Sequence, residues 1–154
     1  MKVFISYGSG ADQVTALRLQ ALAAVNGLTV YVPPVHTRQN PTNLLYPEVS
    51  QKLGESDLIL GVLSAGLTEA CRQELNSSLA LRKNTIVMAS PALAQQLQPH
   101  FGANIVVIDP INPDRTEQGI VQHLKTVDAQ QNAKKALLAL VTLALGLLIF
   151  ARAD

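Results

Sequence analysis

Residues 57–83 read DLILGVLSAGLTEACRQELNSSLALRK, and this stretch decides the fold. Its first part, residues 57–64, is almost continuously apolar, as expected of a central strand in a parallel sheet that is covered on both faces. Residues 64–83 follow it directly and repeat apolar side chains at the spacing of an α-helix. A buried strand that leads straight into a helix is typical of proteins in which strands and helices alternate.

Glu74 lies on the apolar face of this predicted helix. At about 100° per residue, one arc is polar and the opposite arc is apolar. The polar arc holds Glu69, Arg72, Gln73, Asn76 and Lys83, and the apolar arc holds Leu67, Ala70, Cys71, Leu75, Leu79 and Leu81. Glu74 falls nearly in line with Leu67 and Leu81. A carboxylate buried without a partner costs several kcal/mol. The pattern therefore leaves three interpretations: a paired Glu, a Glu at the rim whose carboxylate reaches water, or a group placed there for chemistry.

The rest of the chain continues the alternation. Strand patterns cover residues 2–7, 28–32, 57–64, 85–89 and 105–108, and helix patterns cover 9–27, 44–53, 64–83, 91–97 and 116–127. In the first helix the expected buried face is Leu17, Ala21, Ala24 and Val25. The predicted fold is therefore flavodoxin-like, a three-layer α/β/α domain with a five-stranded parallel sheet, over residues 1–128. Any site is expected at the carboxyl ends of the strands.

Composition excludes several functional classes. The net charge is +1 and the charges are scattered, so we expect no nucleic-acid-binding face. A single cysteine excludes an internal disulfide, and the three histidines show no ligand spacing, so we expect no metal site. No GxGxxG, GxxxxGK[ST] or GxSxG motif is present, and the acidic pair of a response-regulator receiver is missing after the first strand.

Composition changes after residues 129–135, which we interpret as a polar linker. Residues 136–151, ALLALVTLALGLLIFA, carry no charge and as a helix would span about 24 Å, slightly short of the roughly 30 Å hydrocarbon core. We expect a single-pass C-terminal anchor in membrane lipid, with the domain on the cytoplasmic side because Lys134 and Lys135 precede the segment. The alternative is a buried helix that packs against another copy of the protein.

Several short segments together resemble a TIR (Toll/interleukin-1 receptor) domain of the bacterial type. They are FISY at residues 4–7, Asp12, GLTVY at 27–31 with the long polar loop beyond it, and the arrangement of Ser64, Cys71, Glu74 and Leu75. The resemblance covers roughly residues 1–128. It departs from the family at Ala70, where many members have Trp.

Many TIR domains hydrolyse or cyclise NAD⁺, and the resemblance implies that Glu74 is the catalytic glutamate and that NAD⁺ is a substrate rather than a cofactor. Glycosidases usually need two carboxylates, but nicotinamide leaves as a neutral molecule, so one should suffice. The substrate-binding candidates are Phe4, Ser6, Tyr7, Gly8, Asp12, His36, Arg38, Tyr46, Ser64 and Cys71.

Among these candidates, Phe4, Tyr7 or Tyr46 would stack on a base or would belong to the core. His36 or Arg38 would meet the pyrophosphate or would lie in a solvated loop. Cys71 is either a reactive thiol or, on its apolar arc, an inert core cysteine.

Three functional hypotheses remain open at this stage. The first is a membrane-tethered NAD⁺ nucleosidase that self-associates through its TIR domains and serves as an immune or signalling effector. The second is a non-catalytic TIR interaction module, in which side chains close the mouth of the cleft. The third is a nucleoside-processing enzyme of the related deoxyribosyltransferase type. Sequence alone does not distinguish hydrolysis from cyclisation.

Overall fold

The computed structural model describes residues 1–39 and 45–130. Within them, five parallel strands form one sheet in the order β2-β1-β3-β4-β5. The strands are β1 (Lys2–Tyr7), β2 (Thr29–Tyr31), β3 (Leu58–Leu63), β4 (Asn84–Ala89) and β5 (Ile105–Val107). This is the flavodoxin-like strand order, so the predicted fold class is confirmed for the domain.

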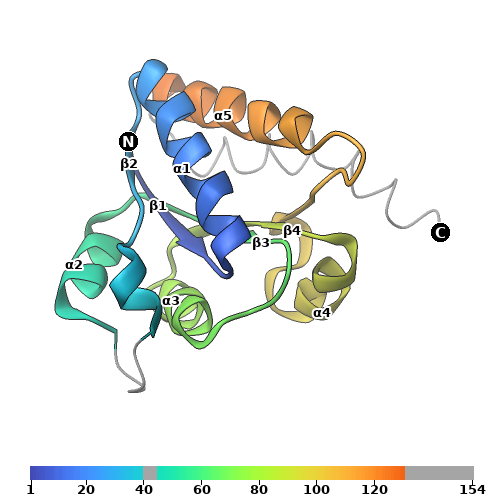
Figure 1. The fold of residues 1–154 in the computed structure, drawn as a ribbon. Helices are drawn as coiled ribbons and strands as arrows, with labels where there is room; N and C mark the ends of the chain where they lie inside the picture. The colour runs from blue at the N-terminus through green and yellow to red at the C-terminus, as the bar shows by residue number, and fades with distance from the viewer. Residues whose placement is uncertain (40–44, 131–154) are drawn as a thin grey trace.

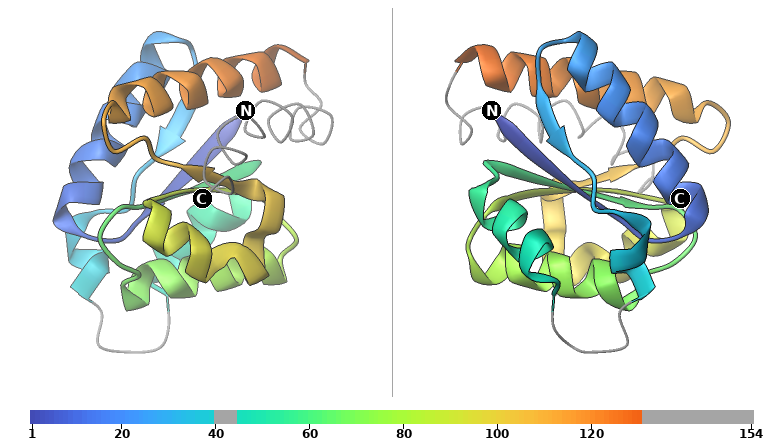
Figure 2. Two further views of the ribbon diagram at one scale, coloured as in Figure 1. Left: turned by 90° about the vertical axis from the view of Figure 1, so that its right-hand side faces the viewer. Right: turned by 60° about the vertical axis from the view of Figure 1, so that its left-hand side comes forward.

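Helices cover both faces of the sheet. Figures 1 and 2 show α1 and α5 on one face and α2, α3 and α4 on the other. They are α1 (Gly10–Val25), α2 (Pro47–Glu55), α3 (Glu69–Ala80), α4 (Pro91–Phe101) and α5 (Pro113–Gln130), with two short 3₁₀ helices, η1 (Val35–Gln39) and η2 (Gly102–Asn104). The main core lies between these layers and the sheet, whose central strand β3 is buried along its whole length.

The C-terminal predictions fall largely outside this description. Helix α5 continues to Gln130, two residues beyond the expected end of the domain at 128. The proposed membrane segment, residues 136–151, lies outside the described residues. Among the helices that are described, none is both long enough and apolar enough to cross a bilayer.

The predicted buried face of α1 is wrong. Leu17 is 47% exposed and Val25 is 86% exposed. The residues that α1 buries are instead Asp12, Ala16, Leu19 and Ala23. Apolar side chains stand on both sides of this helix, so their spacing alone does not select the inner face. A capping box between Ser9 and Asp12 sets the rotation and turns the Asp12 carboxylate inward.

The predicted extent of α3 is also wrong, although its inward residue is right. Thr68 caps the helix, and the helix ends at Ala80. Leu67 and Leu81 therefore lie beyond its ends and are 39% and 55% exposed, and Leu79 is 42% exposed. The buried side of α3 consists of Ala70, Cys71, Glu74, Leu75 and Ser78. Leu67 and Leu81 therefore do not share the buried side of the helix with Glu74.

The strand order places a topological switch point between β1 and β3, where the chain first builds outward to β2 and then returns to the other side of β1. Ligands of such sheets bind beyond the carboxyl ends of the strands at this point. Gly8, directly after β1, lies against the loop that follows β3. A Cβ atom on Gly8 would stand 2.6 Å from the carbonyl oxygen of Gly66 and 3.1 Å from an Asp12 carboxylate oxygen.

We therefore predict that Gly8→Ala destabilises the domain by about 1–3 kcal/mol, since the clash is with backbone that has to shift. Chemical denaturation followed by circular dichroism measures the loss. Gly10→Ala is the matched control, because a Cβ there has no atom within 4 Å. Equal stability of the two variants would contradict the close approach of the two loops.

Candidate functional site

Glu74 is the centre of the candidate site. Thr68 starts α3 by accepting a hydrogen bond from the Cys71 backbone N–H, and one turn later the helix directs Glu74 toward the sheet. The Glu74 side chain is 1% exposed. The interpretation that its carboxylate reaches water is therefore wrong, and the interpretation of a paired, buried Glu is correct.

Arg38, from η1, supplies the partner. Its guanidinium donates to both carboxylate oxygens, from Nη1 to Oε1 at 2.7 Å and from Nη2 to Oε2. The Arg38 side chain is itself only 8% exposed. Ser6, near the end of β1, donates from Oγ to Oε1 of Glu74 at 2.7 Å. A two-pronged, largely dehydrated ion pair of this kind is among the stronger polar contacts in proteins.

Two further contacts hold Arg38 in place. Its guanidinium carbon lies 4.6 Å from the centre of the Tyr7 ring, a cation–π contact. The Tyr7 hydroxyl donates to the Pro33 carbonyl at 2.7 Å, which connects β1 to the chain that follows β2. Arg38 Nε is also buried, and within the described residues it meets no hydrogen-bond acceptor. The arginine is thus well placed, with one N–H group for which the described residues supply no acceptor.

Burial and pairing act in opposite directions on this pair. Burial raises the pKa of the Glu74 carboxyl, while hydrogen bonds and charge from Arg38 and the Ser6 hydroxyl oppose that rise. Burial also disfavours the charged guanidinium, but the hydrogen bonds and charge of Glu74 outweigh it and raise the pKa of Arg38. Arginine stays protonated in proteins, so Glu74 always faces a full positive charge in this arrangement.

Cys71 lies behind the ion pair. Its Sγ is 3.0 Å from Ser6 Oγ, and the residue is fully buried. Burial raises the pKa of the thiol to about 12. A thiol that stays protonated at neutral pH is a poor nucleophile, which favours the core interpretation of this residue over the reactive one.

A second buried carboxylate, Asp12, holds neighbouring loops together. It accepts hydrogen bonds from the backbone N–H groups of Ser9 at 3.1 Å and Ser64 at 2.9 Å, and from the Ser64 hydroxyl. These contacts tie the loop after β3 to the start of α1. Asp12 and Ser64 therefore fix the loops at the carboxyl ends of β1 and β3, and they do not line the pocket at Glu74.

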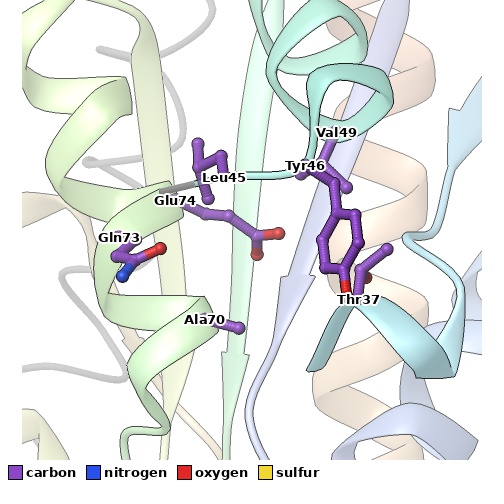
Figure 3. A pocket seen from close by; sticks show the side chains of 7 residues that line it. All are labelled: Thr37, Leu45, Tyr46, Val49, Ala70, Gln73 and Glu74. Carbon is purple, nitrogen blue, oxygen red and sulfur yellow. The ribbon is translucent and has the colours of Figure 1, made fainter. Parts of the chain in front are cut away.

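A small pocket opens beside Glu74. Its cavity volume is only about 10 Å³, and the residues that line it are Thr37, Leu45, Tyr46, Val49, Ala70, Gln73 and Glu74. Figure 3 shows the Glu74 carboxylate pointing from α3 toward Tyr46 and Thr37. Ligand pockets usually enclose about 300–1,000 Å³. This pocket is therefore smaller than a dinucleotide site.

The structure brings together only part of the predicted set. Ser6, Tyr7, Arg38, Cys71 and Glu74 form one cluster, and Tyr46 lies across the pocket from Glu74. The other candidates lie elsewhere: Phe4 is in the core against Tyr31, Gly8 is at the β1 end, and Asp12 and Ser64 pair with each other. His36 is exposed, with its ring edge-on to Tyr46 at 5.6 Å.

Sequence reasoning missed several lining residues. Thr37 stands between two candidates in the polar loop, but its burial (3% exposed) depends on η1, which the sequence did not indicate. Helical spacing places Gln73 on the outer arc of the helix, yet it contributes to the pocket wall. Within the part of the chain that the structure describes, no three His, Cys, Asp or Glu side chains are grouped to hold a metal ion.

No family model and no curated protein matches this chain. Among solved structures, a 2-deoxyribosyltransferase from Bacillus psychrosaccharolyticus is similar with 13% identity and a TM-score of 0.43, over 58% of this chain and 72% of that one. The TIR domains of the activated Roq1 resistosome, which recognises the pathogen effector XopQ, are similar with 15% identity and a TM-score of 0.48, over 93% of this chain and 82% of that one. Likeness at this level assigns no function.

Replacing one member of the buried ion pair should destabilise the folded protein. We predict that Arg38→Met or Glu74→Gln alone lowers the free energy of unfolding by about 3–5 kcal/mol, because each leaves an unpaired charge inside the protein. The double variant should recover most of that loss. Urea denaturation of the four proteins gives the coupling energy.

The exposed pair Arg72–Glu69, on the outer side of the same helix, is the matched control for this cycle. Its coupling should be too small to measure, since solvent screens it. If the buried pair were coupled no more strongly than the exposed pair, the Arg38–Glu74 contact would not exist in solution.

The Cys71 thiol should be inert in the folded protein. At pH 8 a thiol reagent such as Ellman's should label it only after unfolding in urea. Because the folded thiol titrates at about 12 and an unfolded one at about 8.5, only the unfolded chain loses this proton between those pH values. The free energy of unfolding should therefore fall with rising pH across that window, and Cys71→Ala should show a shallower fall. Identical slopes in the two proteins would refute the assignment.

Proposed function

We propose that this chain is a TIR-type NAD⁺ nucleosidase, which breaks the bond between nicotinamide and ribose and releases nicotinamide with ADP-ribose or cyclic ADP-ribose. The observation that carries the proposal is Glu74, a carboxylate shielded from water in the wall of a pocket, beside the switch point of a flavodoxin-like sheet. The resemblance of the sequence to TIR domains names the reaction.

One carboxylate is enough for this chemistry. The bond between C1′ of the ribose and the pyridinium nitrogen breaks, its electron pair goes to that nitrogen, and neutral nicotinamide leaves without a general acid. Positive charge then develops on the ribose ring. Glu74 would stabilise that charge and hold the ribose hydroxyls, an effect that is stronger in a water-excluded site. Attack at C1′ by water, with loss of a proton, gives ADP-ribose, and attack by an adenine nitrogen gives the cyclic product.

Catalysis then requires that Arg38 leaves Glu74. Arg38 contacts both carboxylate oxygens, and Ser6 takes a further lone pair of Oε1. The cavity beside Glu74, of about 10 Å³, is also far too small for nicotinamide riboside. The geometry described above therefore corresponds to a closed state, and the active state has the Arg38 side chain moved aside.

The setting proposed for this activity is the membrane. Residues 136–151 would anchor the chain with the TIR-type domain on the cytoplasmic side, and self-association of the domains would be favoured by confinement in two dimensions. A bacterial immune or signalling effector fits this arrangement.

The Arg38–Glu74 pair favours one second candidate, a non-catalytic TIR interaction module. In that case the ion pair is permanent and serves to shape the loop after β2. This alternative predicts that side chains close the mouth of the pocket. The two candidates differ in what happens when Glu74 loses its charge.

The deciding experiment incubates the full chain in liposomes with NAD⁺ and follows nicotinamide by chromatography. We predict release that falls by about 10²–10³-fold in Glu74→Gln, as is typical when a stabilising group is removed. Glu69→Gln, an exposed acid on the same helix, should retain full activity. Circular dichroism below the melting temperature confirms that each variant is folded.

Two results would favour the interaction module instead. One is the absence of nicotinamide release at high protein density on the membrane. The other is a release that Glu74→Gln leaves unchanged, since the activity would then come from another source. If nicotinamide is released, the accompanying product identifies hydrolase or cyclase.

A further inference from the structure

Arg38 is the one basic side chain that contacts Glu74 among the described residues, and its position limits what can replace it. The backbone of η1 is fixed next to the pocket, because Thr37 lines the pocket wall and donates from Oγ1 to the Pro34 carbonyl at 2.6 Å. The guanidinium rests on the Tyr7 ring at 4.6 Å. A rotation of the side chain alone would therefore leave the positive charge near the pocket.

Moving Arg38 from Glu74 leaves two charges without partners. Both side chains are at least nine-tenths buried, and an unpaired charge at such a depth is strongly unfavourable. A ligand can open the pair only if it offers a cation to Glu74 and an anion to Arg38. Arginine binds carboxylates and phosphates with the same two-pronged geometry, so a phosphate oxygen pair is a direct substitute for the Glu74 carboxylate.

NAD⁺ meets both requirements, because its pyridinium ring is cationic and its diphosphate is anionic. Nicotinamide riboside meets only the first, since it has the same ring and the same scissile bond but no phosphate. It would leave Arg38 unpaired close to another positive charge. Arg38 Nε, which lacks an acceptor among the described residues, would gain one from a diphosphate and so further favours the exchange.

We infer that Arg38 selects the substrate class: it exchanges Glu74 for a diphosphate, so that the site accepts pyridine dinucleotides and rejects the corresponding nucleosides. This inference rests on the proposed nucleosidase function. Arg38 is then both the residue that closes the free site and the residue that recognises the phosphate. Its role differs from that of a permanent structural partner, which would show no preference for anions.

The kinetic test compares kcat/KM for NAD⁺ and for nicotinamide riboside. The wild-type chain in liposomes should prefer NAD⁺ by about 10- to 100-fold, the range expected for one charge-assisted contact. Arg38→Gln should bring that ratio close to one. Arg38→Lys keeps the positive charge but cannot bind an anion through two parallel N–H groups, so it should retain part of the preference for NAD⁺. Arg72→Gln, at an exposed arginine on α3, should leave the ratio unchanged.

A binding test needs no turnover. Inorganic diphosphate should raise the melting temperature of Glu74→Gln more than that of the wild type, because removing the Glu74 charge releases Arg38 for the anion. The double variant Arg38→Gln/Glu74→Gln should lose this shift. Arg72→Gln/Glu74→Gln is its control and should keep it.

The outcomes separate failure of the inference from failure of the proposed function. A ratio that Arg38→Gln does not change, with both substrates turned over, overturns the inference and leaves the nucleosidase standing. If no protein turns over either substrate, the nucleosidase proposal fails. The substrate-class inference then fails with it, and the diphosphate shifts show only whether Arg38 binds anions. A Glu74→Gln shift no larger than that of the wild type overturns the exchange whatever the kinetics show.

Discussion

A carboxylate buried between α3 and the sheet has to meet a positive charge, and this requirement shapes the edge of the domain around it. Glu74 is too deep to be solvated, so Arg38 is drawn in from the connection after β2. Two hydrogen bonds fix that connection: the Tyr7 hydroxyl donates to the Pro33 carbonyl, and the Thr37 hydroxyl donates to the Pro34 carbonyl. The Arg38 guanidinium also packs against the face of the Tyr7 ring. The buried charge and these contacts together fix the position of η1 beside the pocket.

Two of the buried carboxylates, Asp12 and Glu74, differ in what satisfies them. Asp12 is held by backbone N–H groups and by the short Ser64 side chain, none of which can leave without rebuilding a loop or the start of α1. Glu74 is held mainly by the end of one long, flexible side chain. Of these two, only Glu74 can therefore change partners while the backbone stays in place. This difference separates a structural acid from a candidate catalytic one.

Sequence reasoning recovered the fold because the relevant signals are local. The buried run before residue 64 and the alternation of patterns are readable without tertiary information, and strand β1 has the predicted bounds. Glu74 was recognised as inward-facing from helical period alone. Its partner was not, because Arg38 is 36 residues away and no local pattern links them. The inner face of α1 was misjudged for a related reason: Ala and Leu stand on both sides of it, and the buried Asp12 made the correct face look polar.

The ion pair also bears on how binding energy would be used in this site. In the closed arrangement the carboxylate is already stabilised by a cation, so a ligand gains little at Glu74 by replacing one positive charge with another. The gain has to come from the anion offered to Arg38 and from contacts remote from the scissile bond. Binding energy used in this way opens the site and does not raise the affinity for the ligand. In the proposed reaction, the carboxylate would face the developing ribose cation without its arginine as nicotinamide leaves, and its stabilising effect would fall on the transition state.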